Sequence, residues 1–275
     1  MIADLASVPT PLLPFSVATF GEGPDVVYLH DVLFDLVSPD GEVPQFLDLL
    51  AAEHTVHAVA LPGFRDLREL PAVEDLDDYV LALSDLLSAL SLERPHLVGT
   101  GLGGWLAAEL AVHRPESLAT LTLVNAYGLG LESQPISRFF DAAAPNPLGG
   151  RREIRELLFA DPDGPVAQSN LPDFPDDDVN ERFFAHIHAA ARIGWSPPAF
   201  YDPKLLSRLG RVRVPTHVVW GEENAVAGMG HARAYESGID DSSLTTISGA
   251  GQSIVIEQPE ALAKAVASFI DHHDT

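Results

Sequence analysis

Short apolar segments alternate with helical segments along most of this chain, and that alternation restricts the fold more than any other feature. Apolar runs with strand character occupy residues 15–20, 26–30, 55–61, 96–99, 118–125, 214–220 and 243–247. Helical segments separate them, at residues 43–53, 76–90, 105–113, 228–237 and 259–271. Strands that alternate with helices form a largely parallel sheet covered by helices. The sequence therefore predicts an α/β protein.

A segment of different composition interrupts the alternation. From about residue 128 to residue 202 the chain is rich in Pro, Asp and Arg, with two helical stretches at 151–159 and 179–193. Inserted segments of this kind often form lids over active sites. We expect one α/β core, residues 1–127 and 203–275, and an inserted helical lid, residues 128–202. The length of 275 residues suits a single domain of this design.

The composition excludes several functions. Forty acidic residues against 16 basic ones give a net charge of −24, and such a surface repels nucleic acid and anionic membranes. No apolar run reaches the roughly 18 residues of a membrane span. The chain has no cysteine, which excludes disulfides and thiolate chemistry. Without a signal-like N-terminus, the expected location is the cytoplasm. The sequence does not predict an oligomeric state.

One glycine-rich motif lies between a predicted strand and a predicted helix. Its sequence, VGTGLGGW at residues 98–105, resembles the nucleophile elbow of α/β-hydrolases. Other segments resemble the same family in order and spacing: VVYLHD (the oxyanion strand), HAVALPGF, VPTHVVWGEEN (the acid strand) and GAGQSIVIEQPEAL (the histidine loop). The resemblance spans nearly the whole chain. It implies a mostly parallel central sheet flanked by helices, with a helical lid after the sixth strand, and it is closest to lidded members that cleave esters or carbon–carbon bonds.

The residues that the family uses for catalysis are replaced. Gly101 stands at the nucleophile position, Asn224 at the acid position and Gln252 at the histidine position. A glycine cannot attack a substrate, glutamine cannot exchange a proton near neutral pH, and asparagine cannot stabilise an imidazolium. Asn and Gln keep hydrogen-bonding capacity, so we expect the Asn224 and Gln252 side chains to bond to each other. Glycine also relaxes the strained elbow backbone.

A fourth departure affects the oxyanion hole. The resemblance assigns this hole to the backbone amides of Leu102 and Val32, yet the usual His-Gly before it is His30-Asp31 here. If Asp31 faces the pocket, its carboxylate opposes a developing oxyanion. If it points to solvent or caps a turn, the hole is unaffected. Both orientations remain open on the sequence alone.

Other side chains are candidates for chemistry or binding. Possible acid–base groups are Asp31, His30, Tyr127, His186 and His188; the two lid histidines are about 200° apart on a helix and so cannot form a metal pair. The predicted ligand pocket comprises Gly101, Leu102, Trp105, Tyr127, Phe139, Phe140, Trp195 and Gln252. No motif indicates a dinucleotide, a phosphate loop or a metal, so no cofactor is expected.

Three functions are compatible with these features. The first is a non-catalytic pseudo-hydrolase that binds a small apolar molecule under the lid, or a partner. The second is a non-hydrolytic enzyme, of the cyclase, lyase or isomerase type, that uses the retained cavity and other acid–base groups. The third is a hydrolase with a displaced triad. A pseudo-hydrolase binds its ligand without converting it, a non-hydrolytic enzyme converts its ligand without consuming water, and a hydrolase consumes water as it cleaves its substrate.

Overall fold

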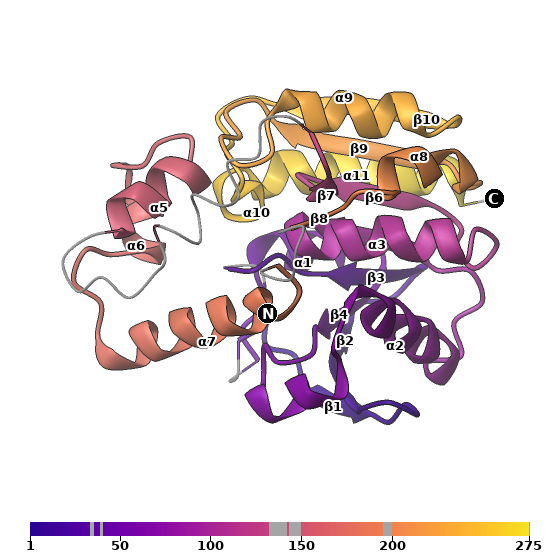
Figure 1. Ribbon diagram of the computed structural model, residues 1–275, viewed down its shortest axis with the longest axis horizontal. Coiled ribbons are helices and arrows are strands. Elements are labelled where there is room, and N and C mark those ends of the chain that lie inside the picture. Colours follow the sequence, from indigo (N-terminus) through magenta and orange to yellow (C-terminus); the bar gives the residue numbers. More distant parts are fainter. Residues whose placement is uncertain (34–35, 39–40, 132–141, 143–149, 195–199, 275) are drawn as a thin grey trace.

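A computed structural model describes residues 1–33, 36–38, 41–131, 142, 150–194 and 200–274 of the chain. Its centre is an eight-stranded sheet with the strand order β1-β2-β4-β3-β5-β6-β9-β10 (Figure 1). The strands are β1 (Leu5–Val8), β2 (Phe15–Phe20), β3 (Asp25–Leu29), β4 (Thr55–Ala60), β5 (His96–Thr100), β6 (Leu121–Val124), β9 (Thr216–Gly221) and β10 (Ser242–Ile247). Strand β2 runs antiparallel to both of its neighbours, and all the other pairs are parallel.

Helices cover both faces of this sheet. One face carries α1 (Gln45–Leu50), α10 (Ile254–Glu257) and α11 (Pro259–His273). The other face carries α2 (Leu76–Ala89), α3 (Gly101–His113), α8 (Leu205–Arg208) and α9 (Met229–Gly238), with the 3₁₀ helices η1 (Leu67–Ala72) and η2 (Leu209–Arg211).

The residues of one central strand show how the two faces are built. In β3, Val26 and Tyr28 pack into the core under α1 and α11, whereas Val27 and Leu29 pack into the core under α2 and α3. Successive side chains of a strand point to opposite faces, and a parallel strand covered on both faces is apolar throughout. The continuous apolar run in the sequence is therefore the signature of a doubly covered strand.

A separate group of helices follows β6. The chain passes through β7 (Gly128–Leu129), α5 (Arg151–Leu158), α6 (Pro165–Asn170), α7 (Asp177–Gly194) and β8 (Tyr201–Asp202) before it returns to the core. Figure 1 shows α5, α6 and α7 standing to one side of the sheet. The two ends of this segment meet, because β7 and β8 pair in parallel. The loops of this segment are held together by the buried side chain of Arg155. It donates hydrogen bonds to the backbone carbonyls of Pro162 and Leu171 and forms an ion pair with Asp173.

Most of the predicted elements are present, and the fold class is confirmed. The largest difference in a predicted helix is the start of α3, which begins at Gly101 instead of residue 105. Glycine disfavours helix by about 1 kcal/mol relative to alanine, so the local sequence hides this first turn, which packing imposes. Strand β1, which the sequence analysis missed, is short and half exposed. In the part of the chain that the structure describes, no helix could span a membrane and no side-chain cluster could hold a metal ion.

Candidate functional site

Four loops meet at the carboxyl ends of the parallel strands. Asp31 follows β3, Gly101 follows β5, Asn224 follows β9 and Gln252 follows β10. In open α/β sheets, ligands bind in the crevice outside these strand ends. The fold thus brings together four of the residues that the sequence analysis singled out.

Glycines at the start of α3 let the helix approach the sheet closely. A Cβ atom on Gly103 would lie 2.2 Å from the carbonyl oxygen of Leu29 in β3, so only glycine fits there. Gly101 has a φ of +45°, in the left-handed region that favours glycine. A Cβ atom on Gly101 would lie 2.0 Å from Cγ of Asp31 and 2.1 Å from both of its carboxylate oxygens. The Asp31 carboxylate therefore occupies the space that a side chain at position 101 would need.

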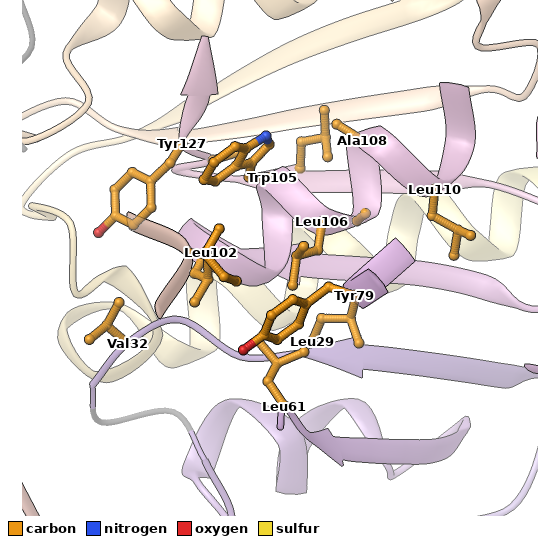
Figure 2. Close-up of a cluster of buried hydrophobic side chains, with 14 of the residues drawn as sticks. Leu29, Val32, Leu61, Tyr79, Leu102, Trp105, Leu106, Ala108, Leu110 and Tyr127 are labelled. Atoms are coloured by element: carbon orange, nitrogen blue, oxygen red, sulfur yellow. The ribbon is translucent and has the colours of Figure 1, made fainter. Parts of the chain in front are cut away.

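The Asp31 side chain points into the site and is held by four donors. Its Oδ1 accepts hydrogen bonds from the backbone amides of Val32, at 2.7 Å, and Leu102, at 3.0 Å. Its Oδ2 accepts from Nε2 of Gln252, at 2.8 Å, and from the hydroxyl of Tyr127, at 3.2 Å. Figure 2 shows Leu102 at the start of α3, and Tyr127 with its hydroxyl on the side of Val32. A carboxylate has about four lone-pair positions, and all four are used.

Two opposing effects act on the pKa of the Asp31 carboxyl group. Burial raises the pKa of the Asp31 carboxyl above its ordinary value, because removal from water disfavours the charged form. The hydrogen bonds from Leu102, Gln252, Val32 and Tyr127 work against this rise. Of the two orientations left open by the sequence, the structure has the inward one. The amides assigned to the oxyanion hole are therefore occupied by the protein's own carboxylate.

A chain of amides leads to the same carboxylate. The backbone amides of Val226 and Ala227 donate to Oδ1 of Asn224, each at 2.9 Å. Nδ2 of Asn224 donates to Oε1 of Gln252 at 2.8 Å, and Gln252 in turn donates to Asp31. The predicted hydrogen bond between Asn224 and Gln252 is thus confirmed. Every donor in the chain points toward Asp31, so each bond polarises the next in favour of the negative charge.

Asn125 was missed by the sequence analysis, although it fixes the position of Gln252. This buried residue follows β6 with a φ of +48°. Its Nδ2 donates to the carbonyls of Gly251 and Gln252, and its Oδ1 accepts from the amide of Gly221 at the end of β9. The sequence signal was an asparagine directly after a buried strand, a residue type that tolerates the left-handed region.

The histidine candidates differ in their surroundings. Burial lowers the pKa of His30 to about 3, so its ring is neutral. Both of its nitrogens bond to the backbone: Nδ1 to the carbonyl of Asp31, at 2.5 Å, and Nε2 to the amide of Leu61, at 3.0 Å. His30 thereby holds the loop that carries Asp31. His186 contacts Phe64 and has a pKa lowered to about 4, mainly by burial, whereas His188 is exposed.

Of the predicted pocket residues that the structure describes, Trp105 lines the cleft described below, whereas Gly101, Leu102, Tyr127 and Gln252 do not line it. Trp105 and Tyr127 lie beside one another in Figure 2 and both contact Phe200. Trp105 also lines a cleft of about 390 Å³ between the start of α2, α3, the end of α7 and the β8–α8 segment. Phe139, Phe140 and Trp195 lie outside the described residues. The cleft thus joins the core to the segment that follows β6.

A second buried carboxylate lies next to this cleft. Glu109, one helical turn beyond Trp105 on α3, is 1% exposed and accepts a hydrogen bond from Nε1 of Trp105 at 3.2 Å. Burial is the main reason that its pKa rises to about 7. Sequence analysis did not single it out, because a lone glutamate in a helix is usually solvated.

A family model described as "Alpha/beta hydrolase family" matches residues 26–265. Among curated proteins, the chain is 29% identical over 230 residues to the dihydrolipoyllysine-residue acetyltransferase component of an acetoin cleaving system from Pseudomonas putida, covering 82% of this chain and 58% of that protein. It is 37% identical over 109 residues to a pimeloyl-[acyl-carrier protein] methyl ester esterase from Aeromonas hydrophila, covering 40% of each. The chain therefore spans about half the length of these two relatives.

A match that covers a larger share of the relative is to 2-hydroxy-6-oxo-6-phenylhexa-2,4-dienoate hydrolase from Comamonas testosteroni, at 26% identity over 69% of this chain and 67% of that protein. Solved structures with the same fold include a bacterial membrane phospholipase A, with a TM-score of 0.81, 19% identity, and coverage of 99% of this chain and 87% of that one. Another is the 2-hydroxy-6-oxo-6-phenylhexa-2,4-dienoate hydrolase of Rhodococcus, with a TM-score of 0.72, 17% identity, and coverage of 98% and 99%. In this chain Gly101 is the first residue of α3, Asn224 lies between β9 and α9, and Gln252 lies between β10 and α10.

Replacing Asn224 by aspartate tests the direction of the amide chain. Asn224→Asp puts a carboxylate against Oε1 of Gln252, and turning the Gln252 amide around would place Oε1 against Asp31 instead. One mismatched contact remains in either arrangement, so we expect a loss of about 1–3 kcal/mol in unfolding free energy at pH 8. Urea denaturation measures it.

The matched rescue is Asn224→Asp combined with Gln252→His. A protonated imidazole donates from both nitrogens and satisfies both carboxylates, so the double variant should recover stability below about pH 7. Equal stability of the single variant and the parent at pH 8 would contradict the proposed polarity.

Replacing Glu109 by glutamine tests its buried charge. The pKa of the folded protein, about 7, exceeds the ordinary value of 4.5. The stability that the neutral carboxyl contributes is therefore full below about pH 4.5 and is lost as the pH rises toward and through 7. Glu109→Gln should remove about 3 kcal/mol of this pH dependence between pH 4 and pH 8. Parallel pH–stability profiles for parent and variant would contradict the assignment; Glu116→Gln on the exposed turn after α3 is the control.

Proposed function

The chain belongs to the α/β-hydrolase family, and from that premise we propose that it binds a small molecule without hydrolysing it. In this proposal, residues 128–202 serve as the lid and the cleft beside Trp105 receives the ligand. The relatives' hydrolase names describe those proteins, and their common fold hosts many reactions. The function of this chain is argued from its own site.

The observation that carries the proposal is the position of the Asp31 carboxylate. It takes the hydrogen bonds of the Val32 and Leu102 amides, which would otherwise stabilise the oxyanion of a tetrahedral intermediate. It also fills the space next to Gly101 in which a nucleophile's side chain would lie. A substrate carbonyl at this point would meet a negative charge in place of two free donors.

The remaining groups support the same conclusion. Gln252 cannot act as a base, and its amide is committed to Asp31, Asn125 and Asn224. His30 is neutral and bonded to the backbone through both nitrogens. Nucleophilic hydrolysis needs an activated nucleophile, a base and free oxyanion donors. In this proposal the site lacks all three.

Ligand binding is supported by the cleft that Trp105 lines. Its volume of about 390 Å³ lies within the usual range for sites of small molecules. Its walls come from both the core helices and the segment after β6, so a ligand there contacts both. In this proposal the α/β-hydrolase fold serves to bind a ligand, and this binding does not require a catalytic triad.

One observation favours a second candidate, a non-hydrolytic enzyme. The pKa of Asp31 is raised by burial, and its Oδ2 accepts a hydrogen bond from the Tyr127 hydroxyl. A carboxyl group with a raised pKa next to a hydroxyl can transfer protons in a lyase or isomerase reaction. Conversion of a bound ligand without incorporation of oxygen from ¹⁸O-labelled water would favour this candidate over a pure binding role.

The first test is turnover of a panel of p-nitrophenyl esters by the purified protein. We expect rates equal to those of a mock preparation from the same host. We also expect no labelling by a fluorophosphonate, because Gly101 has no side-chain nucleophile to be phosphonylated. Ester hydrolysis that disappears with Asp31→Asn or Gln252→Ala would instead establish a displaced catalytic apparatus and overturn the proposal.

The second test couples Gly101 to Asp31 in a double-mutant cycle. Gly101→Ala in the parent adds a Cβ atom onto the Asp31 carboxylate as well as strain at positive φ, so a loss of about 2–4 kcal/mol is expected. In the Asp31→Gly background only the strain remains, so the same change should cost about 1–2 kcal/mol. Equal costs in the two backgrounds, measured by thermal unfolding, would show that Asp31 does not fill this space.

Restoring a triad also requires removal of the carboxylate. Gly101→Ser, Asn224→Asp and Gln252→His together should remain inactive while Asp31 occupies the hole. Adding Asp31→Gly frees the amides of Val32 and Leu102, and weak esterase activity is then expected from the quadruple variant. Activity of the folded triple variant, measured with p-nitrophenyl acetate, would contradict the blocking role of Asp31.

A further inference from the structure

The cleft beside Trp105 has an unusual balance of charge. Its walls carry three aspartates, Asp75, Asp77 and Asp202, and two cations, Lys204 and Arg208. Arg208 is paired with Asp202 at 3.0 Å, and Asp75 caps α2 by accepting from the amide of Asp78. Asp77 and Lys204 are both exposed. Acidic side chains outnumber basic ones on these walls, and one of the two cations, Arg208, already contacts Asp202.

Glu109 adds a further carboxyl group to this balance. Its side chain is 1% exposed, and its Oε1 accepts a hydrogen bond from Nε1 of Trp105. Three residues that line the cleft, Asp202, Arg208 and Asp77, interact electrostatically with it, so the carboxyl group lies close to the cleft. The described residues form no ion pair with it.

A buried carboxylate in this condition has two ways to reach a low free energy. It can hold a proton, or it can meet a cation that replaces lost hydration. Without a ligand, Glu109 is stabilised by binding a proton, which is why its pKa is raised. A cationic ligand in the cleft would stabilise the ionised form instead. An anionic ligand would worsen the imbalance, because carboxylates already outnumber cations in and beneath the cleft.

We propose that this cleft binds a small aromatic amine, with the ammonium group against Glu109 and the ring against Trp105 and Tyr201. Aromatic faces next to carboxylates are a common environment for ammonium groups. The inference rests on the proposed binding role and specifies the class of ligand. It requires no contribution from Asp31 or Gln252.

Ligand binding is coupled to the ionisation of Glu109. The charged groups around this carboxyl are Asp77 on α2, Asp202 on β8 and Arg208 on α8. The neutral hydroxyl of Tyr235 on α9 also faces it, and Trp105 on its own helix donates a hydrogen bond to it. Glu109 changes from mostly protonated at pH 6 to mostly ionised at pH 8. An ammonium ligand, which stays protonated over this range, should therefore bind about tenfold more tightly at pH 8 than at pH 6.

The experiment is isothermal titration calorimetry with phenethylamine at pH 6 and pH 8, with phenethyl alcohol as the neutral control. The expected result is binding of the amine, about tenfold tighter at the higher pH, and little binding of the alcohol. Glu109→Gln keeps an acceptor for Trp105 and should weaken amine binding and abolish its pH dependence. Glu116→Gln, outside the cleft, should leave both unchanged.

A second measurement needs no variant. At pH 6, binding of the amine should release a proton from Glu109, and titrations in buffers of different ionisation enthalpy detect it; at pH 9 the release should vanish. Equal, pH-independent binding of amine and alcohol would overturn the choice of ligand class and leave the binding role standing. Failure of both probes to bind would overturn the inference and the assigned cleft, while the blocked hydrolytic site would still stand on the Asp31 variants.

Discussion

A carboxylate removed from water must be given hydrogen-bond donors, and the demand of Asp31 for four of them organises the carboxyl end of this sheet. Each donor comes from a different place in the chain: Val32 after β3, Leu102 in α3, Tyr127 after β6 and Gln252 after β10. Loss of any one would leave a buried charge short of a partner, which costs more than an ordinary hydrogen bond contributes. The loops are therefore fixed relative to one another by one charge.

The same interaction makes the replaced positions interdependent. Asp31 fits only because Gly101 has no side chain, and Gln252 must present a donor because it faces an anion. Asn224 must in turn present a donor to Gln252 and an acceptor to the amides of Val226 and Ala227. A substitution at one of these positions therefore alters a contact made by another.

Strand and helix periodicity, a property of neighbouring residues, was sufficient for the sheet. The contact between Asn224 and Gln252 followed from the family resemblance, which relates segments far apart in the chain. The direction of Asp31 was not accessible in this way. It depends on space vacated at Gly101, 70 positions later, and on donors from three other elements. Asn125 and Glu109 were missed for the same reason: an asparagine after a strand and a glutamate in a helix are unremarkable until distant segments enclose them.

The carboxyl groups of Asp31 and Glu109 receive different numbers of hydrogen bonds, and that difference separates their roles. Asp31 has four donors, so the hydrogen-bonding capacity of its carboxyl group is filled within the protein, although burial still raises its pKa. Glu109 has one donor, from Trp105, and a pKa near 7, so its charge is not fully stabilised. A carboxyl group whose hydrogen bonds are all made within the protein has a structural role. A carboxyl group that lacks donors beside an open cleft can gain stabilising contacts from a ligand. We therefore expect Glu109 to contribute to the affinity for a ligand, and Asp31 to hold the surrounding loops in place.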